Sequence, residues 1–243
     1  MIEVKGRVLP QPKLSYRDNQ RPPDMSQGSW NLNGVILITA KSLGRWSILK
    51  LNKGASSSSG IESRHYNPFV KTVRHTFGET SLISDPYFPW SAMIKDADDD
   101  NTLKDQFASC QDCRVAFLVV ILPDDDARLY KRVKYLGDIE YGIHTVCVID
   151  NPKKFSKAKP ESGAAKAYCA NVALKINLKL GGCNHALDNK HMGIIFEENT
   201  MVVGIDVTHP APGSATNAPS IAAMVASVDN KVNLSLFTLP KAK

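Results

Sequence analysis

The order of apolar segments predicts an α/β fold in which a central parallel sheet is flanked by helices. Arg114–Leu122 (RVAFLVVIL) is apolar almost throughout, as expected for a parallel strand covered on both faces. Ile143–Ile149 is a second, mostly apolar and β-branched run, and a helical pattern ending at Gly137 lies between the two. This strand–helix order is typical of a doubly wound, Rossmann-like domain, which we place at about residues 43–188.

The first part of the chain contributes fewer regular elements. Residues 1–42 are polar and broken by prolines, and only Val35–Thr39 is predicted to be a strand. Trp46–Leu51 is a clear strand candidate, and Lys53–Gly60 is a Gly/Ser-rich connector. Ile61–Phe77 then follows a helical period.

The middle of the chain alternates turns with regular elements. Asp85–Trp90 is a proline-punctuated turn, and Asp96–Asp100 is predicted to be a solvated acidic loop. A helix is expected over Thr102–Cys110, before the strongest strand. Pro123–Asp126 turns the chain out of that strand and offers an Asp as the N-cap of the next helix.

A different unit begins after the Gly181–Asn189 loop. Thr200–Val207 is predicted to be a strand that carries Asp206 near its end, and Ser220–Val228 is a candidate partner strand. An Asp late in a buried strand is a typical metal-ligand position in nucleases built on RNase H-like sheets. The alternative is an acid that caps a loop through hydrogen bonds, and this stretch alone does not decide between the two.

Composition excludes few functions. The 243 residues include 30 Lys+Arg and 24 Asp+Glu, and the resulting charge of +6 favours a polyanionic partner only weakly. Five cysteines with no signal peptide ahead of them indicate a reducing compartment. Cys110 and Cys113 form a C-x-x-C without a second ligand pair, so zinc is not expected. No apolar run approaches the ~18 residues of a membrane-spanning helix.

Two predicted helices present matching polar pairs. Tyr130 and Lys134 are four residues apart on the first, and Lys175 and Lys179 are four apart on the second, so each pair shares a helix face. Three cations and a phenol from two helices form a candidate anion pocket, which we expect beyond the carboxyl ends of the strands. The alternative is that these are ordinary solvated lysines on surface helices.

Six motifs follow one another along the chain: GRVLP at 6–10, QGSW at 27–30, LVVILP at 118–123, Tyr130-x-x-x-Lys134, LKINLKLGG at 174–182 and GIDVTHP at 204–210. In this order they resemble the motifs of eukaryotic Argonaute proteins, and the long loops and polyserine stretch are most similar to the fungal, quelling-type members. The resemblance implies that 1–42 ends an interdomain linker, 43–188 is a MID domain and 189–243 begins an RNase H-like PIWI domain.

The family's MID domain holds the 5′-phosphate of a small guide RNA, which implies roles for the matching residues. Tyr130 matches the tyrosine that stacks on the first base, and Lys134, Lys175 and Lys179 match the phosphate-binding lysines. The family usually has a glutamine before the cysteine of the central strand, whereas this chain has Val146.

The missing glutamine leaves a donor to be supplied. His144 lies two residues earlier, on the strand face of Val146, and is our candidate replacement. Thr145 occupies a position that often carries a hydroxyl, although alternation would turn it away, and Cys147 completes the implied site. In the family, the loop before the first helix reads the base; here it is the acidic run Asp124-Asp125-Asp126.

In the PIWI part, Asp206 matches the first acid of the family's metal-binding catalytic set. Two-metal cleavage needs several ligands around paired Mg²⁺, and one Asp cannot supply them. We therefore expect that this chain alone is not an enzyme and holds no cofactor, whereas a full-length protein would use Mg²⁺. The implied partners are the 5′ end of a small guide RNA and, through the full-length protein, target RNA and silencing-complex proteins. We expect a cytoplasmic protein with no membrane partner.

Overall fold

The computed structural model describes residues 6–8, 13–19, 32, 34–52, 73, 75–79, 91–94, 99–149, 163–187, 192–197, 200–210, 218–227 and 234–240. The predicted features at Lys53–Gly60 and Asp85–Trp90 lie outside these residues, as do the QGSW motif and most of the predicted helix Ile61–Phe77. Val73 and residues 75–77 of that helix are helical as predicted, and the helix continues to residue 79.

The chain divides into two compact units. One is Tyr16–Asn184, and the other combines Met1–Ser15 with His185–Lys243. The division after Asn184 lies close to the predicted boundary at residue 188, whereas residues 16–42 belong to the larger unit. The predicted linker, MID and PIWI boundaries stay predictions.

The Tyr16–Asn184 unit contains a four-stranded parallel sheet in the order β3-β2-β4-β5. β2 (Trp46–Leu51) and β4 (Phe117–Leu122) are central, and β3 (Ser91–Ile94) and β5 (His144–Ile149) form the two edges. The predictions for β2, β4 and β5 are confirmed. β4 begins later than Arg114 because that residue has a φ of 55° and turns the chain before the strand.

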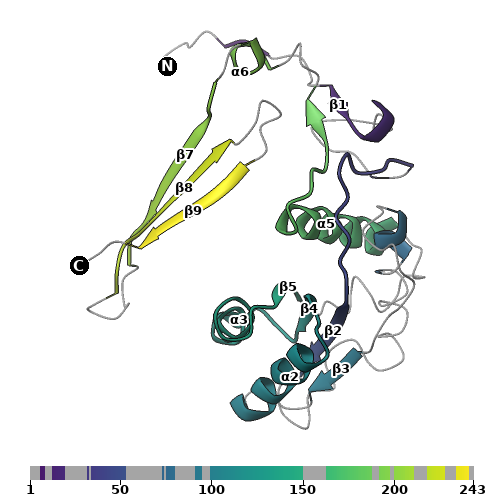
Figure 1. The fold of residues 1–243 in the computed structure, drawn as a ribbon, viewed down its shortest axis with the longest axis vertical. Coiled ribbons are helices and arrows are strands. Elements are labelled where there is room, and N and C mark those ends of the chain that lie inside the picture. The colour runs from purple at the N-terminus through teal and green to yellow at the C-terminus, as the bar shows by residue number, and fades with distance from the viewer. Residues whose placement is uncertain are drawn as a thin grey trace, which may run out of the picture. The chain divides into compact units, whose positions relative to one another are not determined.

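Helices lie on both faces of this sheet (Figure 1), and its alternating side chains enter two apolar layers, one on each face. Helix α5 (Gly163–Lys179) covers one layer, and helices α2 (Asp100–Asp112) and α3 (Ala127–Tyr135) cover the other. The first layer contains Phe117, Val119, Ile121, Val146 and Val148, and the second contains Leu118, Val120, Leu122, Val133 and Leu136. Both faces are therefore buried, as the uninterrupted apolar sequence of β4 predicts.

Side chains at the helix ends fix α2 and α3. Asp99 caps α2 by accepting from the Asn101 N–H, and Arg132 of α3 pairs with Asp100 at the start of α2. After Tyr135 the chain continues as a π-helical turn, η2 (Leu136–Glu140), rather than stopping at Gly137 as predicted. This turn brings the end of α3 against β5.

The end of α5 is fixed by a buried asparagine. Asn177 accepts from the Lys41 backbone N–H at 3.0 Å, and it donates to the Thr39 carbonyl at 3.1 Å and to the Asn184 side chain at 2.9 Å. The predicted strand Val35–Thr39 is wrong: only Thr39 makes a β-bridge, to Cys183, because the segment runs over α5 rather than along a sheet. These bonds hold the last turn of α5, from which Lys179 projects.

The other unit contains a three-stranded antiparallel sheet in the order β7-β8-β9. Its strands are β7 (Val203–Thr208), β8 (Ile221–Ser227) and β9 (Leu234–Pro240), and the sequence does not predict β9. The short elements of this unit are β1 (Leu14–Ser15), β6 (Ala186–Leu187) and α6 (Ile194–Glu197). The 3₁₀ turn η1 (Arg17–Asn19) belongs to the Tyr16–Asn184 unit. Among the described helices, none has the length and apolarity to cross a membrane.

Candidate nucleic-acid interface

Helix α3 presents the first polar pair of the candidate site. The Asp126 carboxylate accepts from the Arg128 N–H at 2.8 Å and so caps the helix, as the sequence predicts. One turn on, Tyr130 is 46% exposed, and one further turn places Lys134 in a half-buried position. The helix thus offers an accessible aromatic ring beside a partly desolvated ammonium group.

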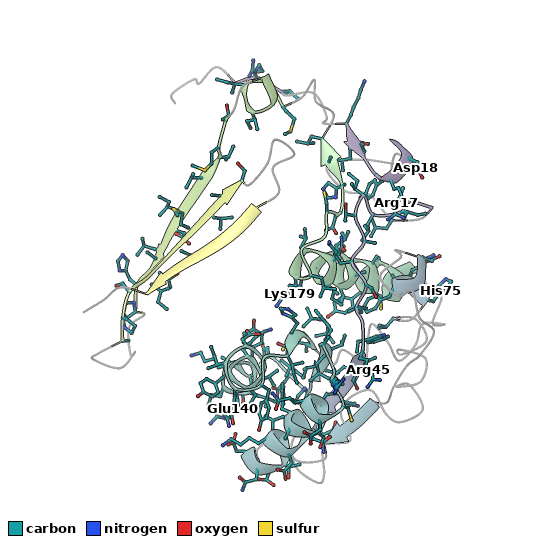
Figure 2. All side chains as sticks on the ribbon, in the orientation of Figure 1. Arg17, Asp18, Arg45, His75, Glu140 and Lys179 are labelled. Atoms are coloured by element: carbon teal, nitrogen blue, oxygen red, sulfur yellow. The ribbon has the colours of Figure 1, made fainter. Side chains whose placement is uncertain are left out.

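Two lysines from different helices meet at Thr145. The Lys134 Nζ donates to the Thr145 carbonyl oxygen at 2.8 Å and to its Oγ1 at 2.6 Å. The Lys179 Nζ donates to the same carbonyl at 3.0 Å, and Figure 2 shows its side chain leaving the end of α5. The predicted convergence of Lys134 and Lys179 is therefore present in the structure.

The place of this meeting follows from the sheet order. β5 is an edge strand, and α3 and α5 cover opposite faces of the sheet, so side chains from both helices can reach its edge. Thr145 pairs with Leu118, the second residue of β4, so the lysines gather near the amino ends of these strands. The expected position beyond the carboxyl ends is wrong for this cluster.

Thr145 also corrects the expectation that alternation would turn it away. Alternation does place Thr145 and Cys147 on the α3 face, opposite Val146. The lysines, however, come from both faces, and Lys134 itself belongs to α3. A fully buried threonine is thus the common hydrogen-bond partner of the two cations.

The electrostatics extend the cluster to Cys147 and Lys175. Desolvation lowers the pKa of Lys179, and the nearby charge of Lys134 lowers it further, while Asp138 acts in the opposite direction. Burial raises the pKa of the half-buried Cys147 thiol, and Lys134, Lys179 and Lys175 oppose that rise. The three predicted lysines therefore act on one thiol, and positive charge dominates the site.

His144 lies on the other face of β5. It is exposed, and its ring centroid is 6.3 Å from that of Phe117, the residue paired with it in β4. The predicted shared face with Val146 is consistent with this position. Its role in place of the family's glutamine stays a prediction.

The acidic loop before α3 uses two of its three carboxylates locally. The Asp124 carboxylate accepts from the Asp126 N–H at 3.1 Å, and Asp126 caps α3. Asp125 is exposed. The loop therefore has a defined turn, whereas its predicted part in base selection stays untested.

Asp206 lies in β7, paired with Ala223, and is exposed. Its carboxylate accepts from the backbone N–H of Val207 at 2.9 Å. Within the ranges that the structure describes, no three His, Cys, Asp or Glu residues are placed to hold a metal ion. These residues alone do not fit the Mg²⁺ site that the resemblance implies.

Sequence reasoning missed two contributors to the lysine cluster. Asp138 acts on Lys179 from η2, and Gly137 of the same turn lies against Thr145. The sequence indicates Gly137 only as a helix-stop signal. Its close approach to β5 depends on tertiary packing, and a glycine in sequence does not show what it will contact.

A family model described as the Piwi domain matches residues 117–242, slightly more than half of the chain. The chain belongs to the Piwi-domain family. Among similar sequences, protein argonaute 1B of Oryza sativa subsp. japonica is 28% identical over 240 residues, covering 94% of this chain and 20% of that protein. Protein argonaute MEL1 of the same species is 30% identical, covering 94% of this chain and 21% of that protein.

Solved structures of Argonaute and Piwi proteins share the fold of this Piwi-family chain. The N. crassa QDE-2 AGO MID-PIWI structure is 29% identical with a TM-score of 0.61, over 82% of this chain and 52% of that one. Drosophila Piwi, at 17% identity, has a TM-score of 0.70 over 97% of this chain and 30% of that one.

The Piwi-family chain is thus similar in sequence and fold to the MID-PIWI region of Argonaute proteins, and its predicted α/β fold is confirmed. It spans about a fifth of the length of the plant relatives named above.

Proposed function

We propose that this chain binds the 5′-phosphorylated terminal nucleotide of a small guide RNA and thereby serves RNA silencing. The observation that carries the proposal is the convergence of Lys134 and Lys179, from two helices, on the carbonyl of Thr145. That carbonyl holds two ammonium groups together before any ligand arrives. An anion bound there would relieve their mutual repulsion.

The chemistry of the cluster suits a terminal phosphate. Such a group carries a charge near −2 at neutral pH and several acceptor oxygens, so it is bound best by cations and hydroxyls. Lys134, Lys175 and Lys179 supply the charge, and each charge-assisted bond contributes about 1.5–3 kcal/mol. Part of that is offset by desolvation of the ammonium groups.

Tyr130 supports recognition of a nucleotide rather than of phosphate alone. This residue is 46% exposed and lies one helical turn from Lys134. Stacking of a base on an aromatic ring contributes roughly 1–3 kcal/mol with little dependence on the base. Any base preference would come from the Asp124–Asp126 turn, where Asp124 and Asp126 already accept backbone hydrogen bonds.

The decisive experiment compares 5′-phosphorylated and 5′-hydroxyl RNA of one sequence for binding to the purified chain. We expect the phosphorylated RNA to bind more tightly, with a dissociation constant for a lone nucleotide of about 10–1,000 μM. Lys134→Ala should cost at least ~1.5 kcal/mol of that preference, as the loss of a charge-assisted bond does. Equal binding of the two RNAs by the wild-type chain would contradict the proposal.

Lys131→Ala is the matched control for Lys134→Ala. Lys131 is also on α3 but is solvent-exposed, and it is not among the groups that act on Lys179 or Cys147. An exposed lysine attracts RNA through its backbone charge and so changes the binding of both RNAs by a similar factor. Only Lys134→Ala should reduce the difference between them.

A histidine variant tests the proposed replacement for the family's glutamine. Phosphate favours the charged form of an imidazole. If His144 contacts the phosphate, binding should weaken as the pH rises from about 6 to 8, because the ring loses its charge. The second ionisation of the phosphate acts in the opposite direction. Parallel pH profiles for wild type and His144→Ala would make His144 a packing residue.

The wider assignment is to a fungal, quelling-type silencing protein acting in the cytoplasm with target RNA and silencing-complex proteins. The 29% identity to the N. crassa MID-PIWI structure supports it. The second candidate function is guide-directed RNA cleavage by a longer protein. Because the described residues form no metal-ligand group around Asp206, we expect this chain to cleave no complementary RNA with Mg²⁺ present. Guide-dependent cleavage by the purified chain would overturn that expectation.

A further inference from the structure

Gly137 lies in the π-helical turn η2, directly against the start of β5. A Cβ added to Gly137 would be 2.5 Å from the Thr145 Cγ2, 2.9 Å from the Ile143 carbonyl oxygen and 3.3 Å from the Thr145 Oγ1. Both Gly137 and Thr145 are buried, and the Ile143 N–H donates to the Gly137 carbonyl at 2.8 Å. The turn therefore touches the strand at a place where only a hydrogen atom fits.

This contact concerns the residue on which both lysines meet. The Thr145 carbonyl accepts from Lys134 and Lys179, and its hydroxyl accepts from Lys134. A side chain at position 137 would push the Thr145 methyl group and move the carbonyl and hydroxyl with it. The separation of the two ammonium groups would change, although neither lysine had been altered.

The donor count shows why that separation matters. Each ammonium group has three N–H donors. Two donors of Lys134 and one of Lys179 bond to Thr145, which orients the remaining donors of both groups from a single point. A phosphate that accepts from both lysines needs those remaining donors to converge on it.

We propose that Gly137 is a positioning residue for 5′-phosphate recognition, acting through Thr145 to set the spacing of Lys134 and Lys179. This inference rests on the proposed function and adds to it the part of the fold that aligns the two cations. It predicts that a methyl group at position 137 weakens selection for the 5′-phosphate more than it weakens binding of RNA in general.

The test measures the affinity ratio between 5′-phosphorylated and 5′-hydroxyl RNA for four forms of the full chain, with thermal unfolding of each. They are wild type, Gly137→Ala, Thr145→Ser and the double variant. Gly137→Ala should reduce the ratio at least fivefold, within the effect of one charge-assisted hydrogen bond.

The double variant, Gly137→Ala with Thr145→Ser, tests whether the effect passes through the Thr145 side chain. Serine lacks the Cγ2 that the new methyl group would strike but keeps the Oγ that accepts from Lys134. The double variant should therefore regain a large part of the lost ratio. Regain will be incomplete because the Ile143 carbonyl, 2.9 Å from the added Cβ, is unchanged. Gly78→Ala is the control, since an added Cβ meets nothing within 4 Å there.

Each possible result supports or overturns a specific claim. A wild-type ratio of one overturns the proposed function itself, and this inference with it. If the wild-type ratio is high and a folded Gly137→Ala keeps it, Gly137 is not a positioning residue. A loss in Gly137→Ala that Thr145→Ser does not relieve, although Thr145→Ser alone keeps the ratio, overturns the route through Thr145. If neither variant with alanine at position 137 folds, Thr145→Ala decides: it removes the Cγ2 and Oγ1 atoms that lie against Gly137, and an unchanged ratio overturns the inference.

Discussion

The two sheets of this chain bury their residues very differently. In the parallel sheet, every residue of β2 and β4 is buried, and helices cover both faces. In the antiparallel sheet, every residue of β7 is exposed, with Ile205 at 71%. Parallel sheets require cover on both faces, whereas antiparallel pairing can form with a face open.

The difference shows what each sheet can do. Pairing with β8 is enough to give β7 its extended backbone, but nothing among the described residues fixes the Asp206 side chain beyond its own backbone neighbour. At the edge of the parallel sheet, packed layers on both faces bring α3 and α5 to one carbonyl group. A site built from α3, α5 and β5 therefore depends on a sheet that has helices packed on both faces.

The largest expected difference in stability is between two variants that carry the same substitution, one in each sheet. Ile121→Asp places a carboxylate in β4 at a residue with 0% exposure, whereas Ile205→Asp places one in β7 at 71% exposure. A buried charge without a partner costs several kcal/mol, comparable with the whole stability of a domain. Ile121→Asp should abolish the cooperative unfolding transition seen by circular dichroism, and Ile205→Asp should shift it little. Similar shifts for both would mean that the two sheets do not differ in this way.

A smaller effect is expected from the fastening of α5. In Gly182→Ala, the new Cβ would lie 2.1 Å from the Asn177 Oδ1, breaking the asparagine's bonds to Lys41 and Thr39. Loss of a buried hydrogen-bond network should lower the free energy of unfolding by about 2–4 kcal/mol.

Gly78→Ala is the matched control because it lies in a helical segment with open space at its Cβ position. It should be neutral or slightly stabilising. Chemical denaturation of both variants checks the pair. A Gly182→Ala protein as stable as Gly78→Ala would show that the Asn177 network does not hold α5.

The cap of α3 should contribute less. Asp126→Ala removes the acceptor for the Arg128 N–H and should lower the unfolding free energy by about 1 kcal/mol. Asp125→Ala, at the exposed neighbouring position, should change it by no more than ~0.5 kcal/mol. Equal urea midpoints for the two variants would contradict the cap.

Much of the fold can be predicted because it depends on local pattern. β2 has the predicted bounds, and the apolar runs identify β4 and β5. The short edge strand β3 is missed because its four residues are too few for a period, and the strand β9 is missed as well. Val35–Thr39 has the composition of a strand, but packing over α5 determines its conformation.

The site is predictable in composition rather than in arrangement. Helical spacing pairs Tyr130 with Lys134 and Lys175 with Lys179, and the family motifs contain all four residues. Neither shows that the lysines meet at the edge strand, because this depends on strand order and on which face each helix covers. For that reason sequence reasoning places Thr145 on the wrong side of the pocket and treats Gly137 as a helix end.

The smallest expected effect is a pH dependence that only the covered sheet can produce. Burial and the charge of Lys134 disfavour the ammonium form of Lys179, so its pKa in the free protein lies below the ordinary 10.5. A bound phosphate dianion favours that form and raises the pKa again. Binding therefore takes up a proton wherever the pH lies between the two values, and affinity must fall as pH rises through the lower one.

Adenosine 5′-monophosphate is a suitable ligand because its phosphate is fully ionised above about pH 7.5 and its base does not titrate up to about pH 9.5. Over that range we expect wild-type affinity to fall as the pH rises, because the lowered pKa of Lys179 makes its ammonium group lose its proton earlier than an ordinary lysine would. Lys179→Arg keeps its charge throughout and should give a flatter profile. Calorimetry in buffers of different ionisation enthalpy should show proton uptake by wild type alone. Superimposable profiles would mean that the Lys179 ammonium is not desolvated at Thr145, and that the parallel sheet gathers these lysines without changing their chemistry.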